Sequence, residues 1–260
     1  MSRSRLFNIV AIVLRHRTMG EADVLLTLFS KNRGKLRVIA KGARKASSRK
    51  AGHISQFTES EMLLAQGRNL DIVTQAQVLT SHRMLREDLE RLTHASHLAE
   101  LVDGFTVEED PHEGLYILLK QALEWVAVDK DAQLATRHFE VFFLELVGYR
   151  PLFFQCAECE QELEPQDQYL SAEQGGVICP KCRGMHPHSI PISLASLKVL
   201  RFLQLQEHDQ VMRLRVSESL HMELEQVMRY LIQHHLERAM KSSKFLKRLR
   251  SEGLGSKEIK

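Results

Sequence analysis

All four cysteines of the chain occur in one short segment, as two C-x2-C pairs that are separated by nineteen residues. They are Cys156, Cys159, Cys179 and Cys182. Two sulfurs of one pair can reach a single ion through a tight turn, and Gly175 and Gly176 supply the flexibility that returns the second pair to the first. Four thiolates form the closed tetrahedral site of structural zinc, so the spacing predicts a structural Zn²⁺ site.

A closed set of four sulfur ligands leaves no open position for water or substrate, which argues against catalysis by the metal. The alternative interpretation is four free or paired thiols, including a redox pair. A thioredoxin-like C-x-x-C needs a βαβ context, which is missing around these cysteines. His186 and His188 could replace a cysteine as ligands, but with four sulfurs at hand we expect them to be surface histidines.

A second candidate site is a basic run of nine Lys and Arg residues, which no acidic residue interrupts. These residues are Lys31, Arg33, Lys35, Arg37, Lys41, Arg44, Lys45, Arg49 and Lys50. Lys35 and Arg37 alternate with Leu36 and Val38, which predicts two charges on one face of a strand whose other face is buried. Small residues in the following loop allow a phosphate backbone to approach closely. We interpret the run as a DNA-binding surface; the alternative is a solvated, partly disordered charge run.

Aromatic side chains are the second requirement for binding single strands, because bases stack on them. The N-terminal region offers only Phe7, Phe29 and Phe57. Phe7 and Phe29 lie in apolar strands and are expected in the core, which leaves Phe57 as the candidate for base stacking. With so few stacking residues, the affinity must come mainly from phosphates, so the expected binding is independent of sequence and weakens steeply with salt.

The charge balance of the 260-residue chain supports this division. Residues 1–80 hold 14 Lys and Arg against 5 Asp and Glu, a net charge of +9, whereas the other 180 residues hold 22 against 28, a net charge of −6. A concentrated positive field attracts a polyanion: nucleic acid first, an acidic membrane surface or protein second. No apolar run approaches the roughly 20 residues of a membrane span. The apolar N-terminal segment is short and lacks a cleavage site, so we expect a cytoplasmic protein.

The elements that must position these residues fall into two groups. Five short apolar runs with turn signals between them predict strands at Leu6–Leu14, Val24–Phe29, Lys35–Ala40, Glu61–Ala65 and Leu70–Leu79. Their number and spacing indicate a small closed β-barrel, for which an OB-fold fits in size and loop placement; strand count alone does not exclude an SH3-like barrel.

After Ser81 the apolar period becomes helical. Helices are expected at Arg83–Leu92, Ala95–Phe105, Leu115–Val126, Phe139–Leu146, Leu194–Leu205 with Ser193 as N-cap, and Leu220–Leu236. The predicted architecture is α+β, with an OB-fold domain at 1–80 and an all-α domain at 81–260. The helical domain carries an inserted zinc-binding module at about 152–190 and a basic tail that frays from about 240. The basic group of this tail is either an auxiliary contact or a solubilising tail.

The order of these features resembles the RecO family of bacterial recombination mediators. The resemblance rests on "VLRHRTMGEADVLLTLFSKNRGKLRVIAKGARK", "LLAQGRNLDIVTQAQVL" and "FFLELVGYRPLFFQCAECEQ…GGVICPKC". It covers roughly residues 6–205, and its most specific part is Gly20, Glu21 and Asp23 before a strand, followed by Gly34 and "AKGAR". The four cysteines resemble those of the zinc-bearing branch of the family.

The resemblance implies a DNA repair and recombination protein of the RecFOR pathway, associated with the nucleoid. It implies binding of single- and double-stranded DNA, annealing of complementary strands, and help to RecA in place of single-strand-binding protein, with RecR and single-strand-binding protein as partners. It implies no enzymatic activity. A nucleotide-processing enzyme is the second hypothesis, but the chain lacks GxxxxGK[ST] and HExxH motifs, and the pairs Glu87–Asp88 and Glu108–Asp110 fit a solvated face. An RNA-binding or transcription-associated protein is the third.

Overall fold

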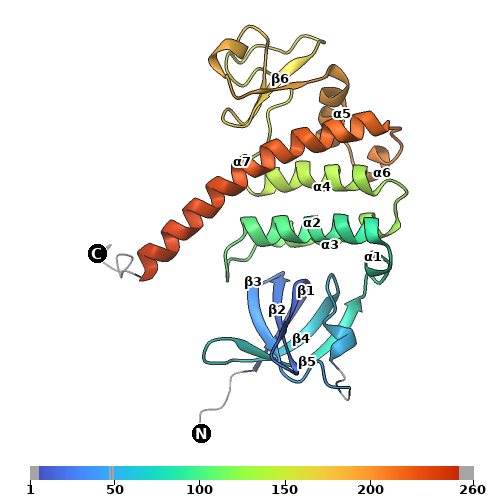
Figure 1. The fold of residues 1–260 in the computed structure, drawn as a ribbon, viewed down its shortest axis with the longest axis vertical. Coiled ribbons are helices and arrows are strands. Elements are labelled where there is room, and N and C mark those ends of the chain that lie inside the picture. The colour runs from blue at the N-terminus through green and yellow to red at the C-terminus, as the bar shows by residue number, and fades with distance from the viewer. Residues whose placement is uncertain (1–5, 47, 49, 252–260) are drawn as a thin grey trace. The chain divides into compact units, whose positions relative to one another are not determined.

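The structure is a computed structural model that describes residues 6–46, 48 and 50–251, with the backbone alone from residue 238 onward. The chain forms two compact units, Met1–Phe139 and Glu140–Lys260. The first unit contains a β-barrel and helices, and the second contains a small sheet and helices (Figure 1). Among the described residues, no helix has the length and apolar character needed to cross a membrane.

The barrel of the first unit has five strands. They are β1 (Leu6–Met19), β2 (Asp23–Ser30), β3 (Gly34–Ala40), β4 (Glu59–Ala65) and β5 (Asp71–Thr80). The strand order is β1-β2-β3-β5-β4, and β4 pairs back with β1. All pairs are antiparallel except β3 with β5, which run parallel. This Greek-key closure is that of an OB-fold, so the predicted barrel type is confirmed and the SH3-like alternative is set aside.

Strand β1 is longer than predicted because it has two partners in turn. Its first half, Leu6–Ile12, pairs with β4, and its second half, from Ala11 to Met19, pairs with β2. The register shifts between Val13 and Arg15, and such a bulge bends a strand enough to serve two sides of a small barrel. The alternate residues Ile9, Ala11 and Val13 point into the core, where Ala11 and Val13 are fully buried.

Helices follow the barrel in the first unit. They are α1 (Met84–Glu87), α2 (Leu89–Phe105), α3 (Glu113–Val128) and α4 (Ala132–Leu146), the last of which continues into the second unit. The predicted helices Arg83–Leu92 and Ala95–Phe105 have a different boundary in the structure. The break lies at Asp88, between the single turn α1 and the long helix α2. The carboxylate of Asp88 accepts a hydrogen bond from the Arg91 amide at 3.0 Å and so caps α2. Helices α2 and α3 lie side by side along one end of the barrel (Figure 1).

A buried carboxylate joins the barrel to α3. Glu59, the first residue of β4, is only 2% exposed. It accepts hydrogen bonds from Tyr116 Oη at 2.6 Å and Thr80 Oγ1 at 3.2 Å, and pairs with Lys120 Nζ at 2.9 Å. Burial alone would raise the pKa of Glu59, but the hydrogen bonds from Tyr116, Lys120 and Thr80 outweigh it and hold the pKa below its ordinary value. The carboxylate therefore remains charged and fully partnered.

The second unit contains a three-stranded sheet of order β7-β6-β8. Its elements are β6 (Gln168–Ser171), β7 (Gly176–Ile178), β8 (Ile190–Ile192), α5 (Leu194–Leu205), α6 (His208–Val211) and α7 (Glu218–Ser251), with a short 3₁₀ turn η2 (Arg183–Met185). The strands are too short to show an apolar period, so the sequence did not predict them. The predicted α5 and its cap are confirmed, since Ser193 Oγ accepts from the Ser196 amide at 3.1 Å.

The C-terminal tail, for which we expect fraying from about residue 240, continues along α7, whose backbone is helical as far as Ser251. The segment from Ala239 to Arg250 contains no Gly or Pro and consists mainly of Ala, Met, Leu, Lys and Arg, which are strong helix formers. The basic side chains from Arg238 onward lie outside the described ones.

The buried carboxylate makes a testable contribution to stability. We expect Tyr116→Phe to lower the free energy of unfolding at pH 7 by about 1–3 kcal/mol, because the Glu59 carboxylate loses its shortest hydrogen bond while still buried. A lowered folded-state pKa stabilises the protein above the ordinary pKa near 4.5 and loses that effect as the pH falls. As the pH falls below this value, the variant should therefore lose less stability than the wild type. Urea unfolding at several pH values measures both effects.

The control variant is Lys120→Gln. The Lys120 side chain is 48% exposed, so its ion pair with Glu59 is screened by water and its replacement should cost less than Tyr116→Phe. Equal stability of wild type and Tyr116→Phe at pH 7 would show that Glu59 does not depend on this hydrogen bond.

Candidate metal centre and nucleic-acid interface

The four cysteines converge in the second unit. Their sulfur atoms all lie within 4.8 Å of one another. Sγ of Cys179 is 3.9 Å from that of Cys159 and 3.6 Å from that of Cys182, distances too long for disulfides. All four cysteines are free. The predicted ligand set is thus assembled in a form compatible with one metal ion.

Two turns hold the sulfurs in place. In the first, the Glu160 amide donates to the Cys156 carbonyl at 2.9 Å, and Glu160 closes the turn at a positive φ of 59°. In the second, the Cys182 amide donates to the Cys179 carbonyl at 3.0 Å. The Cys179 amide also points at Cys156 Sγ, at 3.3 Å, which links the two turns.

The return of the chain between the turns depends on Gly176 rather than on general flexibility. A Cβ at Gly176 would lie 2.6 Å from the Leu152 carbonyl oxygen, because β7 passes directly against that residue. Gly175, just before it, has a positive φ of 70°. The two glycines therefore serve a close approach and a left-handed turn.

The protonation of the thiols fits a cationic occupant. Burial would raise the pKa of Cys156, but amide donors including those of Cys159 and Cys179 lower it to about 6. Burial and the neighbouring sulfurs raise the pKa of Cys182 to about 12. Four sulfurs this close can all ionise only around a positive charge, so the donor set fits a metal dication.

His186 differs from the expectation of a surface histidine. It is 7% exposed, and its Nε2 lies 2.9 Å from the Glu158 carboxylate. Among the described residues, the group of side chains that could hold a metal ion consists of the four cysteines and does not include His186. His188 is exposed, as expected. His186 thus contacts the side chain of Glu158, which lies inside the first C-x2-C turn.

In the first unit, the predicted basic run divides into two sets. Three of its residues are neutralised by carboxylates of the α2–α3 region. Lys31 pairs with Glu113 at 2.9 Å, Arg37 with Glu108 at 2.7 Å and Lys35 with Asp103 at 3.1 Å. Asp103 also pairs with Arg15 of β1, at 2.8 Å. Lys35 and Arg37 do share the solvent-facing side of β3, as predicted, while Leu36 and Val38 are buried.

The segment between α2 and α3 is fixed along β3. The Glu109 amide donates to the Lys35 carbonyl at 3.0 Å, and Glu108 forms a parallel bridge with the same residue. Gly34 lies so close to Asp110 that a Cβ there would overlap the Asp110 carbonyl. This acidic segment, Glu108–Asp110, thus serves as a partner of the strand. The other acidic pair of the sequence is also structural, since Glu87 binds Arg83 and Asp88 caps α2.

Arg33 lies in the turn before β3, and the rest of the run lies in and around the loop that follows β3. Lys41, Arg44 and Lys45 are exposed and have no carboxylate partner among the described residues. Arg44 donates instead to the carbonyls of Gly20 and Glu21 in the β1–β2 turn. Lys50 donates to the Val73 carbonyl at 3.1 Å, and Arg49 lies outside the described residues. The free basic loop, defined as Lys41, Arg44 and Lys45, thus presents exposed charges that have no carboxylate partner among the described residues.

The prediction that Phe57 stacks on bases is wrong. Phe57 is completely buried, although it follows the basic loop, because its backbone pairs with Val13 beside the β1 bulge. Phe7, assigned to the core from its apolar strand, is instead half-buried at the barrel surface. The Arg33 guanidinium lies 4.2 Å from the centre of the Phe7 ring. Phe29 is fully buried, as predicted.

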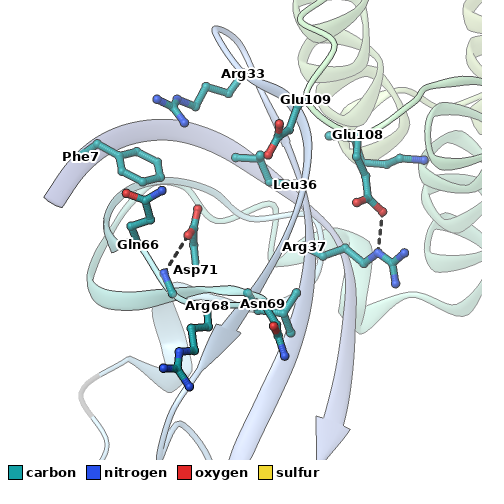
Figure 2. A pocket seen from close by; sticks show the side chains of 13 residues that line it. Phe7, Arg33, Leu36, Arg37, Gln66, Arg68, Asn69, Asp71, Glu108 and Glu109 are labelled. Carbon is teal, nitrogen blue, oxygen red and sulfur yellow. Dashed lines mark hydrogen bonds and ion pairs between the residues drawn. The ribbon is translucent and has the colours of Figure 1, made fainter. Parts of the chain in front are cut away.

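Phe7 borders a pocket of about 840 Å³ on the barrel (Figure 2). The other walls are β3 with the acidic segment, and the loop Gln66–Leu70 between β4 and β5. The sequence predicted a turn between the strands Glu61–Ala65 and Leu70–Leu79 but not a role for Arg68, an exposed cation of this loop. The signal was present, because loops between strands 4 and 5 of OB-folds bind nucleic acids.

Comparison with known proteins decides the family. Residues 1–82 match the family model "Recombination protein O N terminal", and residues 86–244 match "Recombination protein O C terminal". The chain belongs to the RecO family. This confirms the resemblance drawn from the sequence motifs. The boundary between the two RecO models, at residues 82–86, lies near the end of β5 at Thr80 and the start of α1 at Met84.

Relatives named DNA repair protein RecO match nearly the whole chain. The protein of Desulforamulus reducens is 36% identical over 251 residues, which cover 96% of this chain and 98% of that protein. The protein of a Roseiflexus species is 39% identical over 244 residues, 94% of this chain and 86% of that protein. The protein of Pelotomaculum thermopropionicum is 35% identical over 252 residues, 97% and 98% of the two chains.

Loss of one ligand tests the metal centre. We expect Cys159→Ser to reduce the bound metal and to lower the thermal midpoint, because three remaining thiolates no longer close the site. Elemental analysis and thermal unfolding, with and without a chelator, measure both quantities. Lys181→Ser, an exposed position between Cys179 and Cys182, is the control and should change neither. A variant that lost its metal but kept the wild-type midpoint would contradict a structural role.

Proposed function

We propose that this RecO-family chain is a DNA repair and recombination protein that binds single- and double-stranded DNA without sequence specificity. In this proposal it anneals complementary strands and assists the loading of RecA, together with RecR, in place of single-strand-binding protein. The observation that carries the proposal is the free basic loop on an OB-fold barrel in a chain of this family. Because the loop charges have no carboxylate partners among the described residues, they are available to phosphates.

A charged loop of this kind suits annealing. Two DNA strands repel each other through their phosphates, and bound cations reduce that repulsion without contacting the base edges that must pair. Lys41, Arg44 and Lys45 present such cations close together, and Arg44 is fixed by two backbone carbonyls of the β1–β2 turn. The contacts are to the backbone alone, so every sequence can be bound.

We assign the metal as zinc in a structural role, held by Cys156, Cys159, Cys179 and Cys182. Zinc–sulfur bonds of 2.3 Å in a tetrahedron place sulfurs about 3.8 Å apart. The separations of 3.6 and 3.9 Å around Cys179 fit this value. No catalytic step is proposed for this metal, because a site closed by four thiolates offers no position for a substrate.

Charge removal tests the DNA interface. Lys41→Gln, Arg44→Gln and Lys45→Gln together should weaken binding of single-stranded DNA and slow annealing of complementary oligonucleotides. Each lost phosphate contact lowers the salt slope of the affinity by about 0.7 for single strands, so the slope should fall by about 2. Titrations over a range of salt concentrations, with and without single-strand-binding protein in the annealing assay, measure this.

The matched control removes the same kind of charge where it is already neutralised. Lys31→Gln with Arg37→Gln should lower the salt slope by less than about 0.7 per removed charge, because Glu113 and Glu108 already neutralise these cations. If the loop variant anneals like the wild type while the control variant does not, the interface lies on β3 and the assignment to the loop is wrong.

The acidic segment provides a prediction of opposite sign. Glu108→Gln should release Arg37 from its ion pair and add a free cation to the surface. We expect a several-fold tighter binding of DNA at low salt, which shrinks as salt rises. Glu87→Gln, which frees Arg83 from a similar exposed pair on α1, is the control. Weaker binding by Glu108→Gln would mean that the carboxylate orients Arg37 rather than competing with DNA.

A further inference from the structure

The 840 Å³ pocket beside Phe7 has the size of a site for a small ligand (Figure 2). It lies wholly within the first unit, and no residue of the free basic loop lines it. The phosphate contacts of the proposed function therefore do not account for it.

One wall of the pocket is an aromatic ring on a firm base. Phe7 packs against the buried cluster of the barrel, yet remains half-exposed toward the pocket. The Arg33 guanidinium covers the ring at 4.2 Å in the free protein. A planar cation on an aromatic face marks a surface suited to stacking, because nucleobases and guanidinium groups use the same π-face.

The floor of the pocket is a loop that its own contacts hold in shape. Asp71 Oδ1 accepts a hydrogen bond from the Gly67 amide at 3.1 Å, as Figure 2 shows. Gly67 in turn lies so close to Leu70 that a Cβ would overlap the Leu70 carbonyl. The loop presents the exposed side-chain amides of Gln66 and Asn69 to the pocket. An amide both donates and accepts, which suits the edge of an unpaired base.

The charges of the pocket suit a nucleotide better than a bare anion. Arg33 and Arg68 have no carboxylate partner within the described part of the chain, whereas Arg37 is neutralised by Glu108. Glu109 adds an exposed carboxylate to the lining of the pocket. The carboxylate of Glu109 would repel an inorganic phosphate in the pocket. A nucleotide avoids this repulsion when its uncharged base fills the pocket and its phosphate turns toward Arg33 or Arg68.

We propose that this pocket holds one unpaired nucleotide of a bound single strand. The base stacks on Phe7 after Arg33 moves to the adjoining phosphate, the amides of Gln66 and Asn69 contact the base edge, and Arg68 contacts the phosphate backbone. The inference rests on the proposed function, which supplies the strand. It adds a contact to bases, where the free basic loop contacts phosphates alone.

The test compares a fifteen-nucleotide oligodeoxythymidine with an abasic strand of the same length and charge. The wild type should bind the thymidine strand roughly 5- to 100-fold more tightly, the contribution of a stacked base. Phe7→Leu keeps an apolar side chain on the barrel core but no ring. It should remove this preference and leave the affinity for the abasic strand unchanged. Phe7→Trp should retain the preference.

Two controls separate this inference from the proposed function. Leu6→Ala, at a 54% exposed neighbour outside the pocket, should keep the preference. The triple variant of Lys41, Arg44 and Lys45 should weaken the binding of both strands equally and should also keep the preference for the thymidine strand. A wild type that binds both strands equally, or a Phe7→Leu variant that keeps the preference, overturns the pocket but not the proposed function. A wild type that binds neither strand at low salt overturns both.

Discussion

The first unit depends on one buried charge, the carboxylate of Glu59. A charge in the interior is tolerated only when it is fully hydrogen-bonded, and each of its three partners comes from a defined place: Thr80 from the end of β5, Tyr116 and Lys120 from α3. Because the partners reach β4 together, these contacts hold α3 at one position along the barrel. The apolar contacts of the helices stabilise the same position.

That position decides which cations of the barrel are free. With α3 in place, the connection from α2 must run beside β3, where Glu109 pairs with the backbone of Lys35. Asp103, Glu108 and Glu113 then neutralise Lys35, Arg37 and Lys31. Among the described residues, the exposed cations that these carboxylates leave unpaired include the free basic loop, Arg33 and Arg68. A basic run that looks continuous in the sequence is thus divided by tertiary structure into a structural part and an exposed part.

The sequence predicted features that local pattern determines. The five strands follow from apolar runs between turn signals, the α5 cap follows from Ser193, and the cysteine cluster follows from spacing. Features that depend on distant partners were missed. The exposure of Phe7 and the burial of Phe57 could not be predicted, because both are apolar and only barrel closure and the β1 bulge decide which faces solvent. The pairing of β3 cations with α2–α3 carboxylates joins residues about 70 positions apart, such as Arg37 and Glu108.

The proposed metal centre has a different role in the second unit, which is to stabilise short strands. The strands β6, β7 and β8 have 4, 3 and 3 residues, which is too few for an isolated sheet to be stable in water. Modules with so little apolar surface gain stability from a cross-link, and the four clustered cysteines are compatible with a metal ion that would supply one. Four thiolates around a dication carry a net charge of −2, which adds to the negative balance of residues 81–260. In the proposed structural role, the metal would stabilise the second unit, and the positive field would remain with the barrel.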